Sequence, residues 1–214
     1  MSFDKNIKTV ESNNLRDLLL QNIMVIDDFI SVPEIEMCKS SFWEEADCAW
    51  HSDSGRVGTY NVLESSFLSG VIHSRLTPYL SAAYGKQLIP FVQPYVRVYS
   101  EGSSLNYHID GEAEDAFGPL PLGSYHENYS KCAALIEYAA NIYLDNDFSG
   151  GEIIFHKLDV SIKPKAGQLI AFPSGAEFAH SVSKIESGQR TAVVLFYTTG
   201  KLKLLHEKIN KPNK

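Results

Sequence analysis

The pattern of apolar and polar residues changes near residue 90. After that point, short runs rich in Val, Ile, Tyr and Phe recur between Gly, Pro and Asp residues. Each run has the length and composition of a strand bounded by turns. Strands at this spacing predict a closed barrel or a jelly roll of two sheets. The runs are FVQPYVRVY, LNYHID, ALIEYAANIYL, GEIIFH, VSIKP, QLIAFP, AHSVSKI and RTAVVLFYTT.

Before residue 90 the pattern is mainly helical. Ser31 and Val32 precede Pro33 and Glu34, an order that predicts a helix start, because a hydroxyl can cap the first turn and proline is tolerated within it. We expect this helix to run to about Asp47.

A second apolar pattern with helical spacing covers SSFLSGVIHSRLTPYLSAAYGK, residues 65–86. Pro78 lies inside it, and we expect this proline to kink or divide the helix. Together the two helices predict an N-terminal support layer over residues 1–89.

Composition narrows the class of protein. The 214 residues are enough for one domain with a substantial core and too few to make two large domains the expectation. The chain is 44% hydrophobic and 21% charged, and it has no apolar tract long enough to span a bilayer. The first residues, MSFDKNIKTVESNN, are polar and lack the apolar core of a signal peptide. We therefore expect a globular, cytoplasmic protein with no membrane partner.

The net charge bears on a nucleic-acid partner, and the cysteine content bears on disulfide bonds. The net charge is −7, and no basic cluster is longer than the final KLKLLHEKINKPNK, which disfavours a nucleic-acid partner. The three cysteines are odd in number and have no CxxC spacing, so we expect reduced, mostly buried thiols. Nothing in the sequence indicates an oligomeric state.

A metal site is predicted from residues far apart in the chain. His108 and Asp110 are two residues apart in a strand pattern, so their side chains share one face. His180, at the start of a later strand, would complete a two-histidine, one-carboxylate triad of the kind that binds Fe(II). Arg190 follows ten residues later, and its guanidinium suits a carboxylate. This order is what a 2-oxoglutarate-dependent iron oxygenase needs.

The remaining histidines are weaker candidates for metal ligands. His51 and Asp53 repeat the same spacing within WHSDSG, but they lie in a Ser- and Gly-rich segment and are interpreted as a chance match. We expect His73 and His126 to be surface residues or to lie next to the metal ligands without binding the metal. His156 is interpreted as a surface residue, with a substrate contact as the alternative.

Four motifs resemble the prolyl-4-hydroxylase-like 2-oxoglutarate and Fe(II)-dependent oxygenases over roughly residues 91–199. They are VYSEGSSLNYHID, NIYLDNDFSGGEIIFH, SIKPKAGQLIAFPSGAEFAHSV and GQRTAVVLFY, in that order. The resemblance implies a mainly β fold with some α-helix, a double-stranded β-helix or jelly roll. It also implies hydroxylation of a C–H bond with Fe(II), 2-oxoglutarate and O2, releasing succinate and CO2, with ascorbate as reductant.

Position by position, the resemblance makes His108, Asp110 and His180 the iron ligands and Arg190 the partner of the distal carboxylate of 2-oxoglutarate. Two tyrosines match residues that line the co-substrate pocket, although core packing is the alternative for both: Tyr99 and Tyr143. Strand parity independently puts three sets on common faces: Asn141 with Tyr143; Arg190 with Ala192, Val194 and Phe196; and Gln93 with Tyr95, Arg97 and Tyr99. A substrate or co-substrate contact and a solvent-facing charge are equally open for Arg97.

The chain departs from parts of the wider group. Many collagen-type prolyl hydroxylases have lysine where Arg190 stands, and here the chain resembles the oxygen-sensing and bacterial branch. Nucleic-acid dealkylases have a second arginine six residues further on, where this chain has Phe196. The acidic net charge and this phenylalanine disfavour a dealkylase.

The domain prediction is a support region over 1–89, an oxygenase core over 90–200 and a tail over 201–214. Residues 111–131, GEAEDAFGPLPLGSYHENYSK, follow Asp110 directly and are predicted to form a lid; an irrelevant surface insertion is the alternative. Gly150 and Gly151 are interpreted as turn residues.

The leading substrate is a prolyl residue in a peptide or protein. A free amino acid or other small metabolite is the rival within the same chemistry. Two other classes stay open, a cupin-like metal-binding protein that does not use 2-oxoglutarate and a non-catalytic interaction domain.

Overall fold

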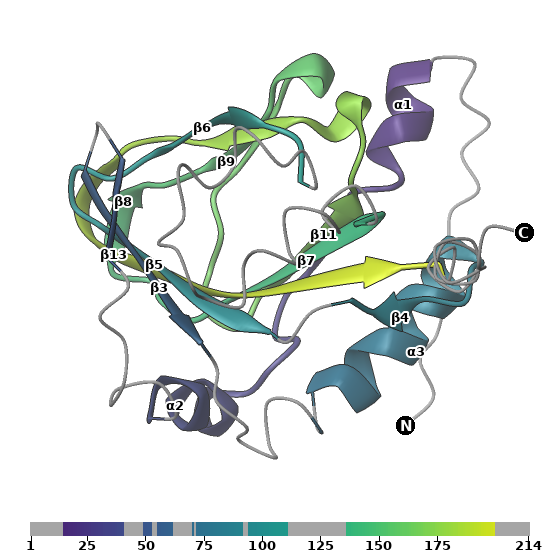
Figure 1. The fold of residues 1–214 in the computed structure, drawn as a ribbon, viewed down its shortest axis with the longest axis horizontal. Coiled ribbons are helices and arrows are strands. Elements are labelled where there is room, and N and C mark those ends of the chain that lie inside the picture. Colours follow the sequence, from purple (N-terminus) through teal and green to yellow (C-terminus); the bar gives the residue numbers. More distant parts are fainter. Residues whose placement is uncertain are drawn as a thin grey trace, which may run out of the picture.

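The structure is a computed structural model that describes residues 15–40, 49–52, 55–61, 70, 72–91, 94–110 and 136–199. Within these ranges two antiparallel β-sheets enclose an inner layer of side chains, and α-helices lie outside them (Figure 1). The helices are α1 (Leu15–Leu20), α2 (Val32–Ser40) and α3 (His73–Tyr84), with short 3-10 turns η3 (His156–Leu158) and η4 (Ala176–Phe178).

The larger sheet has nine strands and the smaller sheet four. The larger sheet contains β1 (Met24–Ile26), β2 (Ala49–Ser52), β3 (Gly55–Asn61), β4 (Ile89–Pro90), β5 (Tyr95–Ser100), β7 (Tyr138–Tyr143), β8 (Phe148–Gly150), β11 (Leu169–Pro173) and β13 (Ile185–Thr198). The smaller sheet contains β6 (Leu105–His108), β9 (Ile153–Phe155), β10 (Val160–Ile162) and β12 (His180–Val182).

The strands of the core alternate between the two sheets along the chain. Strand β5 belongs to the larger sheet, β6 to the smaller, β7 to the larger, β9 and β10 to the smaller, β11 to the larger, β12 to the smaller and β13 to the larger. Along its main path the larger sheet has the order β1-β11-β7-β13-β5-β3-β2, and the smaller sheet has the order β10-β9-β12-β6. This arrangement is a double-stranded β-helix, which confirms the predicted fold class.

Alternate residues of the larger sheet point to opposite faces, and both faces are buried. In β13, Ala192, Val194 and Phe196 face the layer between the sheets, whereas Val193 and Leu195 face the helices. This period of two explains why the run RTAVVLFYTT is almost continuously apolar, as expected for a strand buried on both faces.

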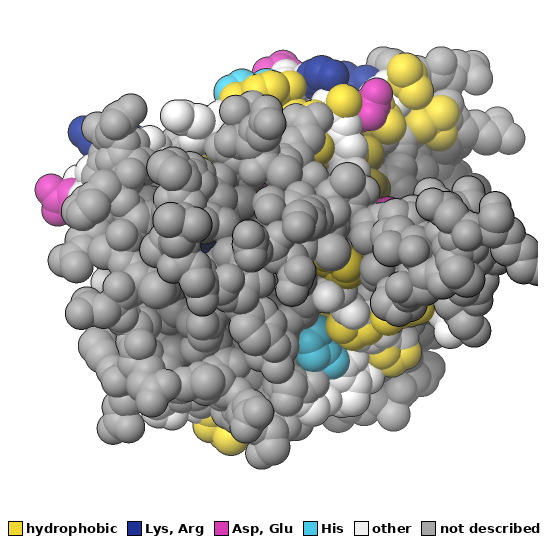
Figure 2. All heavy atoms as spheres, in the orientation of Figure 1, with side chains coloured by type: hydrophobic (Ala, Val, Ile, Leu, Met, Phe, Trp, Pro, Cys, Tyr) yellow, Lys and Arg dark blue, Asp and Glu magenta, His cyan; other side chains and the backbone are white. Residues whose placement is uncertain are grey.

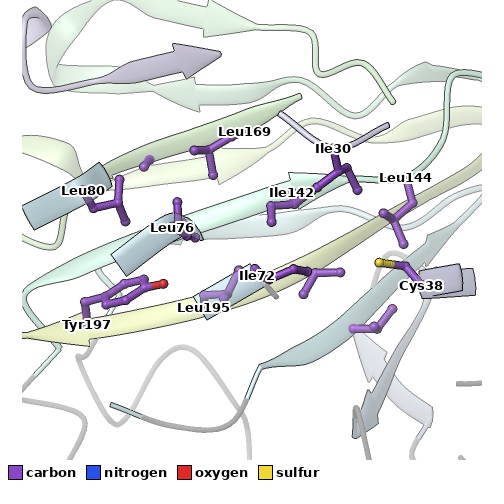
Figure 3. Packing of buried hydrophobic residues seen from close by; sticks show 14 of the residues in the cluster. Ile30, Cys38, Ile72, Leu76, Leu80, Ile142, Leu144, Leu169, Leu195 and Tyr197 are labelled. Atoms are coloured by element: carbon purple, nitrogen blue, oxygen red, sulfur yellow. The ribbon is translucent and has the colours of Figure 1, made fainter. Parts of the chain in front are cut away.

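Helices α2 and α3 cover the outer face of the larger sheet. Leu76 and Leu80 of α3 are fully buried against a cluster that includes Ile142 and Leu195 (Figure 3). Glu34 accepts a hydrogen bond from the Ser31 backbone N–H at 2.7 Å, so the predicted start of α2 is confirmed as one half of a capping box. The larger sheet is therefore supported from behind.

Helix α1 covers part of the inner layer and is only partly packed. The Arg16 side chain donates a hydrogen bond from Nε to the Leu158 carbonyl at 2.8 Å, and Leu19 and Leu20 contact the inner cluster. Figure 2 shows hydrophobic side chains gathered over α1, where Leu15 and Leu18 are exposed. Among the described residues, no helix combines the length and the apolarity that crossing a membrane would require.

The N-terminal part differs from its prediction in two respects. Besides helices, the chain before residue 90 contributes β1, β2 and β3 to the larger sheet. Strand β1 pairs with β11, β3 pairs with β5, and β2 pairs with β3. These pairings satisfy the backbone hydrogen-bonding groups of the early strands, and a local sequence pattern does not predict them. Helix α3 also continues through Pro78, so of the two expected effects of this proline, a kink or a division, the division is wrong, since the burial of Leu76 and Leu80 holds both halves against the sheet.

Several predictions fall on residues that the structure does not describe. Helix α2 is described to Ser40, so its expected extension to Asp47 is untested. The predicted lid over 111–131 and the tail over 201–214 also lie outside the described residues. Gly150 ends β8 and Gly151 follows it in the connection to β9, with φ values of 70° and 71°.

Candidate metal centre

The two predicted histidine ligands lie opposite each other on neighbouring strands of the smaller sheet. His108 ends β6 and His180 begins β12, and the antiparallel register pairs them directly. Asp110 follows two residues after β6 ends, and its Oδ1 lies 3.4 Å from His108 Nε2. Its Oδ2 lies 3.9 Å from His180 Nε2. One ligand atom from each of the three residues therefore lies within 4.8 Å of the others.

Backbone carbonyls orient both imidazole rings. His108 Nδ1 lies 2.8 Å from the Asn106 carbonyl oxygen, and His180 Nδ1 lies 3.1 Å from the Phe178 carbonyl oxygen. A carbonyl only accepts hydrogen bonds, so each Nδ1 carries a proton, and each Nε2 is the ring atom that faces Asp110. This is how metal-binding histidines are commonly held in place.

Burial and neighbouring charges set the protonation of the triad. Burial lowers the pKa of His180 to about 4, so its ring is neutral at physiological pH. Burial alone would raise the pKa of Asp110, but His180, His108 and Arg97 together outweigh that effect and hold it below its ordinary value. His180 is thus a neutral imidazole and Asp110 a carboxylate, the forms in which these groups bind metals.

The predicted co-substrate anchor lies on the larger sheet. Arg190 is only 4% exposed, and its Nη2 donates a hydrogen bond to the Tyr143 hydroxyl at 3.2 Å. Its guanidinium carbon lies 5.0 Å from the Tyr99 ring centre and 4.9 Å from that of Tyr143. Among the described residues, the buried Nε of Arg190 has no hydrogen-bond partner.

The triad and Arg190 line one cavity between the two sheets. Strand parity correctly predicted its wall on the larger sheet, apart from Gln93, which lies outside the described residues. The lining residues from that sheet are Tyr95, Arg97, Tyr99, Asn141, Tyr143, Arg190, Ala192, Val194 and Phe196.

Three apolar lining residues on the smaller sheet were missed. Val182 is two residues after His180 and could have been found by parity, whereas Ile153 and Leu105 could not be placed without the register. Leu105 is three residues before His108, so regular alternation would put its side chain on the face opposite to His108, away from the cavity. The register shifts between the β6–β12 pairs, which lets both residues line the cavity.

The side chains that line the cavity suit the metal ion and the acidic co-substrate that the triad and Arg190 imply. Two imidazole nitrogens and a carboxylate oxygen suit Fe(II) and leave coordination positions open. A buried guanidinium with an unpartnered Nε suits a carboxylate of an organic acid. The donor groups that line the cavity therefore match an iron ion and an acidic co-substrate.

Among the described residues, two of the other histidines, His73 and His156, lie away from this cavity. His73 Nδ1 is 3.4 Å from the Tyr197 hydroxyl on the helix side of the larger sheet, and burial lowers its pKa. His156 is exposed, and its Nε2 lies 2.7 Å from the Ser181 hydroxyl. His51 belongs to the edge strand β2, while Asp53 and His126 lie outside the described residues.

The cysteine prediction is tested at one position. Cys38 is a free, fully buried thiol, and burial raises its pKa to about 12. Cys48 and Cys132 lie outside the described residues.

Sequence comparison identifies relatives of the core. The family model of the 2OG-Fe(II) oxygenase superfamily matches residues 94–198. Prolyl 3-hydroxylase 2 of Rattus norvegicus is 44% identical over 98 residues, which are 44% of this chain and 12% of that protein. Prolyl 3-hydroxylase 1 of Gallus gallus is 37% identical over 67 residues, 29% of this chain and 9% of that protein. This chain thus matches only a small part of the length of these curated relatives.

Solved structures share the fold. The viral collagen prolyl hydroxylase of Paramecium Bursaria Chlorella virus-1, in its 2OG complex, matches with a TM-score of 0.62 and 18% identity, covering 83% of this chain and 96% of that one. A Pseudomonas putida prolyl-4-hydroxylase matches with a TM-score of 0.55 and 15% identity, covering 85% and 95%. These two structures show the fold alone, whereas the family match and the triad assign residues 94–198 to the 2OG-Fe(II) oxygenase superfamily, and the sequence relatives make this core homologous to prolyl hydroxylases.

Proposed function

We propose that this protein is an Fe(II)- and 2-oxoglutarate-dependent dioxygenase that hydroxylates a prolyl residue in a peptide or protein. The observation that carries the proposal is the convergence of the triad and the buried Arg190 on one cavity. The prolyl hydroxylases among its relatives support the choice of substrate.

His108, Asp110 and His180 would hold the iron. Bound Fe(II) and 2-oxoglutarate supply the activation of O2 and the oxidative decarboxylation that releases succinate and CO2. The chain's own part is to keep both Nε2 atoms directed into the cavity through the Asn106 and Phe178 carbonyls. Ascorbate is proposed as the reductant that maintains the iron as Fe(II).

Arg190, Tyr99 and Tyr143 would bind 2-oxoglutarate. The Tyr143 hydroxyl accepts a hydrogen bond from Arg190 Nη2, which leaves the Nε of that guanidinium for the distal carboxylate. Both tyrosine rings lie against the guanidinium and reduce its rotational freedom. The co-substrate would then approach the triad with its orientation already restricted.

Succinate release tests the proposed chemistry. Wild-type protein with Fe(II), ascorbate and 2-oxoglutarate is expected to release succinate in the presence of proline-containing peptides. The variants His108→Ala and Arg190→Ala should be inactive, because the first removes an iron ligand and the second removes the co-substrate anchor. Lys165→Gln, at an exposed position outside the cavity, serves as a charge-matched control. Failure of wild-type protein to bind or consume 2-oxoglutarate would exclude this function.

A second measurement identifies the substrate. A panel of peptides and free amino acids is screened by mass spectrometry for the gain of one oxygen atom. Hydrolysed products are then compared with 3- and 4-hydroxyproline standards, because the sequence relatives are prolyl 3-hydroxylases and a fold relative is a prolyl-4-hydroxylase. Oxygen gain in free amino acids alone would replace the peptide proposal with a metabolite hydroxylase.

A further inference from the structure

A side-chain amide, that of Asn141 in the middle of β7, faces the cavity. Among the described residues that line the cavity, it is the only asparagine or glutamine. Asn141 lies opposite Val194 of β13 and opposite Ile170 of β11, and both of these residues belong to the buried apolar layer between the sheets. A polar side chain therefore occupies a position where both neighbouring strands supply aliphatic ones.

An amide at this position is unfavourable for the fold unless it is hydrogen-bonded. Asparagine is depleted in strands, and an amide among apolar side chains destabilises the folded state when it lacks a partner. Within the described part of the chain, the Asn141 side chain makes no hydrogen bond. Departures from local sequence rules are concentrated at functional sites, which favours a bound ligand as the partner of this amide.

The position of Asn141 in the sheet indicates which ligand it meets. Tyr143, two residues further along β7, shares its face, and the Tyr143 hydroxyl is hydrogen-bonded to the proposed co-substrate anchor. In the other direction along β7, Ala139 lies opposite Phe172, whose ring centre is 4.9 Å from that of His180. Asn141 thus lies between the co-substrate anchor and the part of the sheet that contacts a predicted metal ligand.

The spacing along β7 suits the proposed co-substrate. Two residues of a strand span about 7 Å, which is close to the length of an extended five-carbon diacid. A diacid whose distal carboxylate is held beside Tyr143 therefore has its other end near Asn141. The amide N–H group donates hydrogen bonds, and carboxylate and keto oxygens accept them. Because the amide is neutral, this contact does not depend on the charges of the surrounding residues.

We propose that the Asn141 amide binds the 2-oxo acid end of 2-oxoglutarate, the end that Arg190 does not hold. This inference rests on the proposed function and deepens it. The pocket then holds one end of the co-substrate with a buried cation and the other end with a neutral amide. Both contacts come from the larger sheet, so the smaller sheet supplies the histidines alone.

Two variants test the contact by direct binding. Asn141→Leu removes the hydrogen-bonding groups and nearly keeps the size of the side chain, and Asn141→Ala controls for steric blocking by leucine. Asn22→Leu is the matched control, because it makes the same change at a position outside the cavity. The affinity for 2-oxoglutarate is measured by anaerobic titration calorimetry with Mn(II) in place of Fe(II). The stability of each variant without ligand or metal is measured by denaturant unfolding.

We expect Asn141→Leu and Asn141→Ala to bind 2-oxoglutarate about tenfold or more weakly, the range for a lost hydrogen bond to a charged group. Asn22→Leu should bind it as wild type does. Without ligand, Asn141→Leu should unfold at a higher denaturant concentration than wild type, because leucine suits the apolar neighbours better than an unpaired amide does. Asn22→Leu should gain no stability, because it loses the hydrogen bond from Asn22 Nδ2 to the Leu18 carbonyl at 3.0 Å.

A double variant tests whether the two ends of the ligand are held separately. Tyr143→Phe weakens the distal contact, so its effect and that of Asn141→Leu should be independent. The two factors should then multiply to about a hundredfold weaker binding of 2-oxoglutarate.

Unchanged 2-oxoglutarate affinity in Asn141→Ala would overturn the proposal. A loss of stability in ligand-free Asn141→Leu would also do so, because it would assign the amide a partner within the protein. A double variant that binds no more weakly than the single variants would place both residues at one end of the ligand, against the assignment. If wild-type protein itself fails to bind 2-oxoglutarate, the proposed function fails, whereas normal binding by wild type together with any of these results refutes only the role of Asn141.

Discussion

Replacing Gly151 with alanine should damage both stability and co-substrate binding. Gly151 has a φ of +71°, and a Cβ built on it would lie 2.5 Å from Ile185 Cδ1 and 3.0 Å from Arg190 Cδ. The first distance is shorter than real Cβ contacts, so the end of the Ile185 side chain must shift, and the second requires the Arg190 side chain to give by a few tenths of an ångström. Because Arg190 is the proposed anchor of 2-oxoglutarate, its displacement has a functional consequence that an ordinary turn substitution lacks.

Two costs add up in Gly151→Ala. The left-handed backbone conformation costs a non-glycine residue about 1–2 kcal/mol. Crowding against Ile185 and Arg190 adds about 1–3 kcal/mol, as for overpacked cores. We therefore expect about 2–5 kcal/mol of lost stability. Misplacing the guanidinium by a few tenths of an ångström should cost about 1–2 kcal/mol of a charge-assisted hydrogen bond, which is about a tenfold weaker 2-oxoglutarate affinity.

Gly85→Ala is the matched control. Gly85 also has a positive φ, +62°, but a Cβ there would meet no atom within 4 Å. Gly85→Ala should lose about 1–2 kcal/mol of stability, because only the left-handed backbone conformation is unfavourable for alanine. It should bind 2-oxoglutarate as wild type does. Denaturant unfolding gives the stabilities, and anaerobic calorimetry gives the affinities. If Gly151→Ala bound 2-oxoglutarate normally and lost no more stability than Gly85→Ala, the packing argument would be refuted.

Three further outcomes follow from other contacts. Tyr143→Phe removes the acceptor of the Arg190 Nη2 hydrogen bond and should weaken 2-oxoglutarate binding about tenfold, as read by calorimetry; unchanged affinity would contradict the pairing. His180→Ala removes one of three ligands and should weaken Mn(II) or Fe(II) binding at least about tenfold in an anaerobic titration; wild-type metal affinity would contradict the assignment. The hydrogen bond from Arg75 holds the pKa of Glu34 at about 2, below its ordinary 4.5, so this contact stabilises the folded state above pH 4.5 and is lost as the pH falls towards 2. Thermal unfolding of wild type and Glu34→Gln should therefore differ by about 1 kcal/mol near neutral pH and converge in acid; a constant difference would contradict the linkage.

The strands of the core were predictable because their signal is local. Each of the eight apolar runs after residue 90 contains a strand of the structure, and alternation along β5, β7 and β13 correctly separated the cavity face from the helix face. The early strand β3 was missed because it forms by pairing with β5, a contact distant in sequence, and β2 was missed with it because β2 pairs with β3. Local propensity is overridden there by tertiary pairing.

The triad was predictable for a different reason. Metal ligands need particular residue types, so few combinations in a chain with seven histidines can satisfy the spacing. The cavity wall on the smaller sheet was not predictable in full, since the register shift near Leu105 reverses the parity that alternation assumes. The position of Gly151 against Arg190 was also hidden, because 39 residues separate the two in sequence and only folding brings them together.

The two sheets carry different parts of the proposed site, the histidines that would bind the metal and the residues that would bind organic ligands. Both histidines belong to β6 and β12 of the smaller sheet, whereas Asn141, Tyr143 and Arg190 belong to the larger one. The larger sheet carries the helices on its outer face, so residues on its inner face are held by a packed layer behind them. Substitutions on that inner face can therefore change which acid or substrate binds while the iron ligands keep their places.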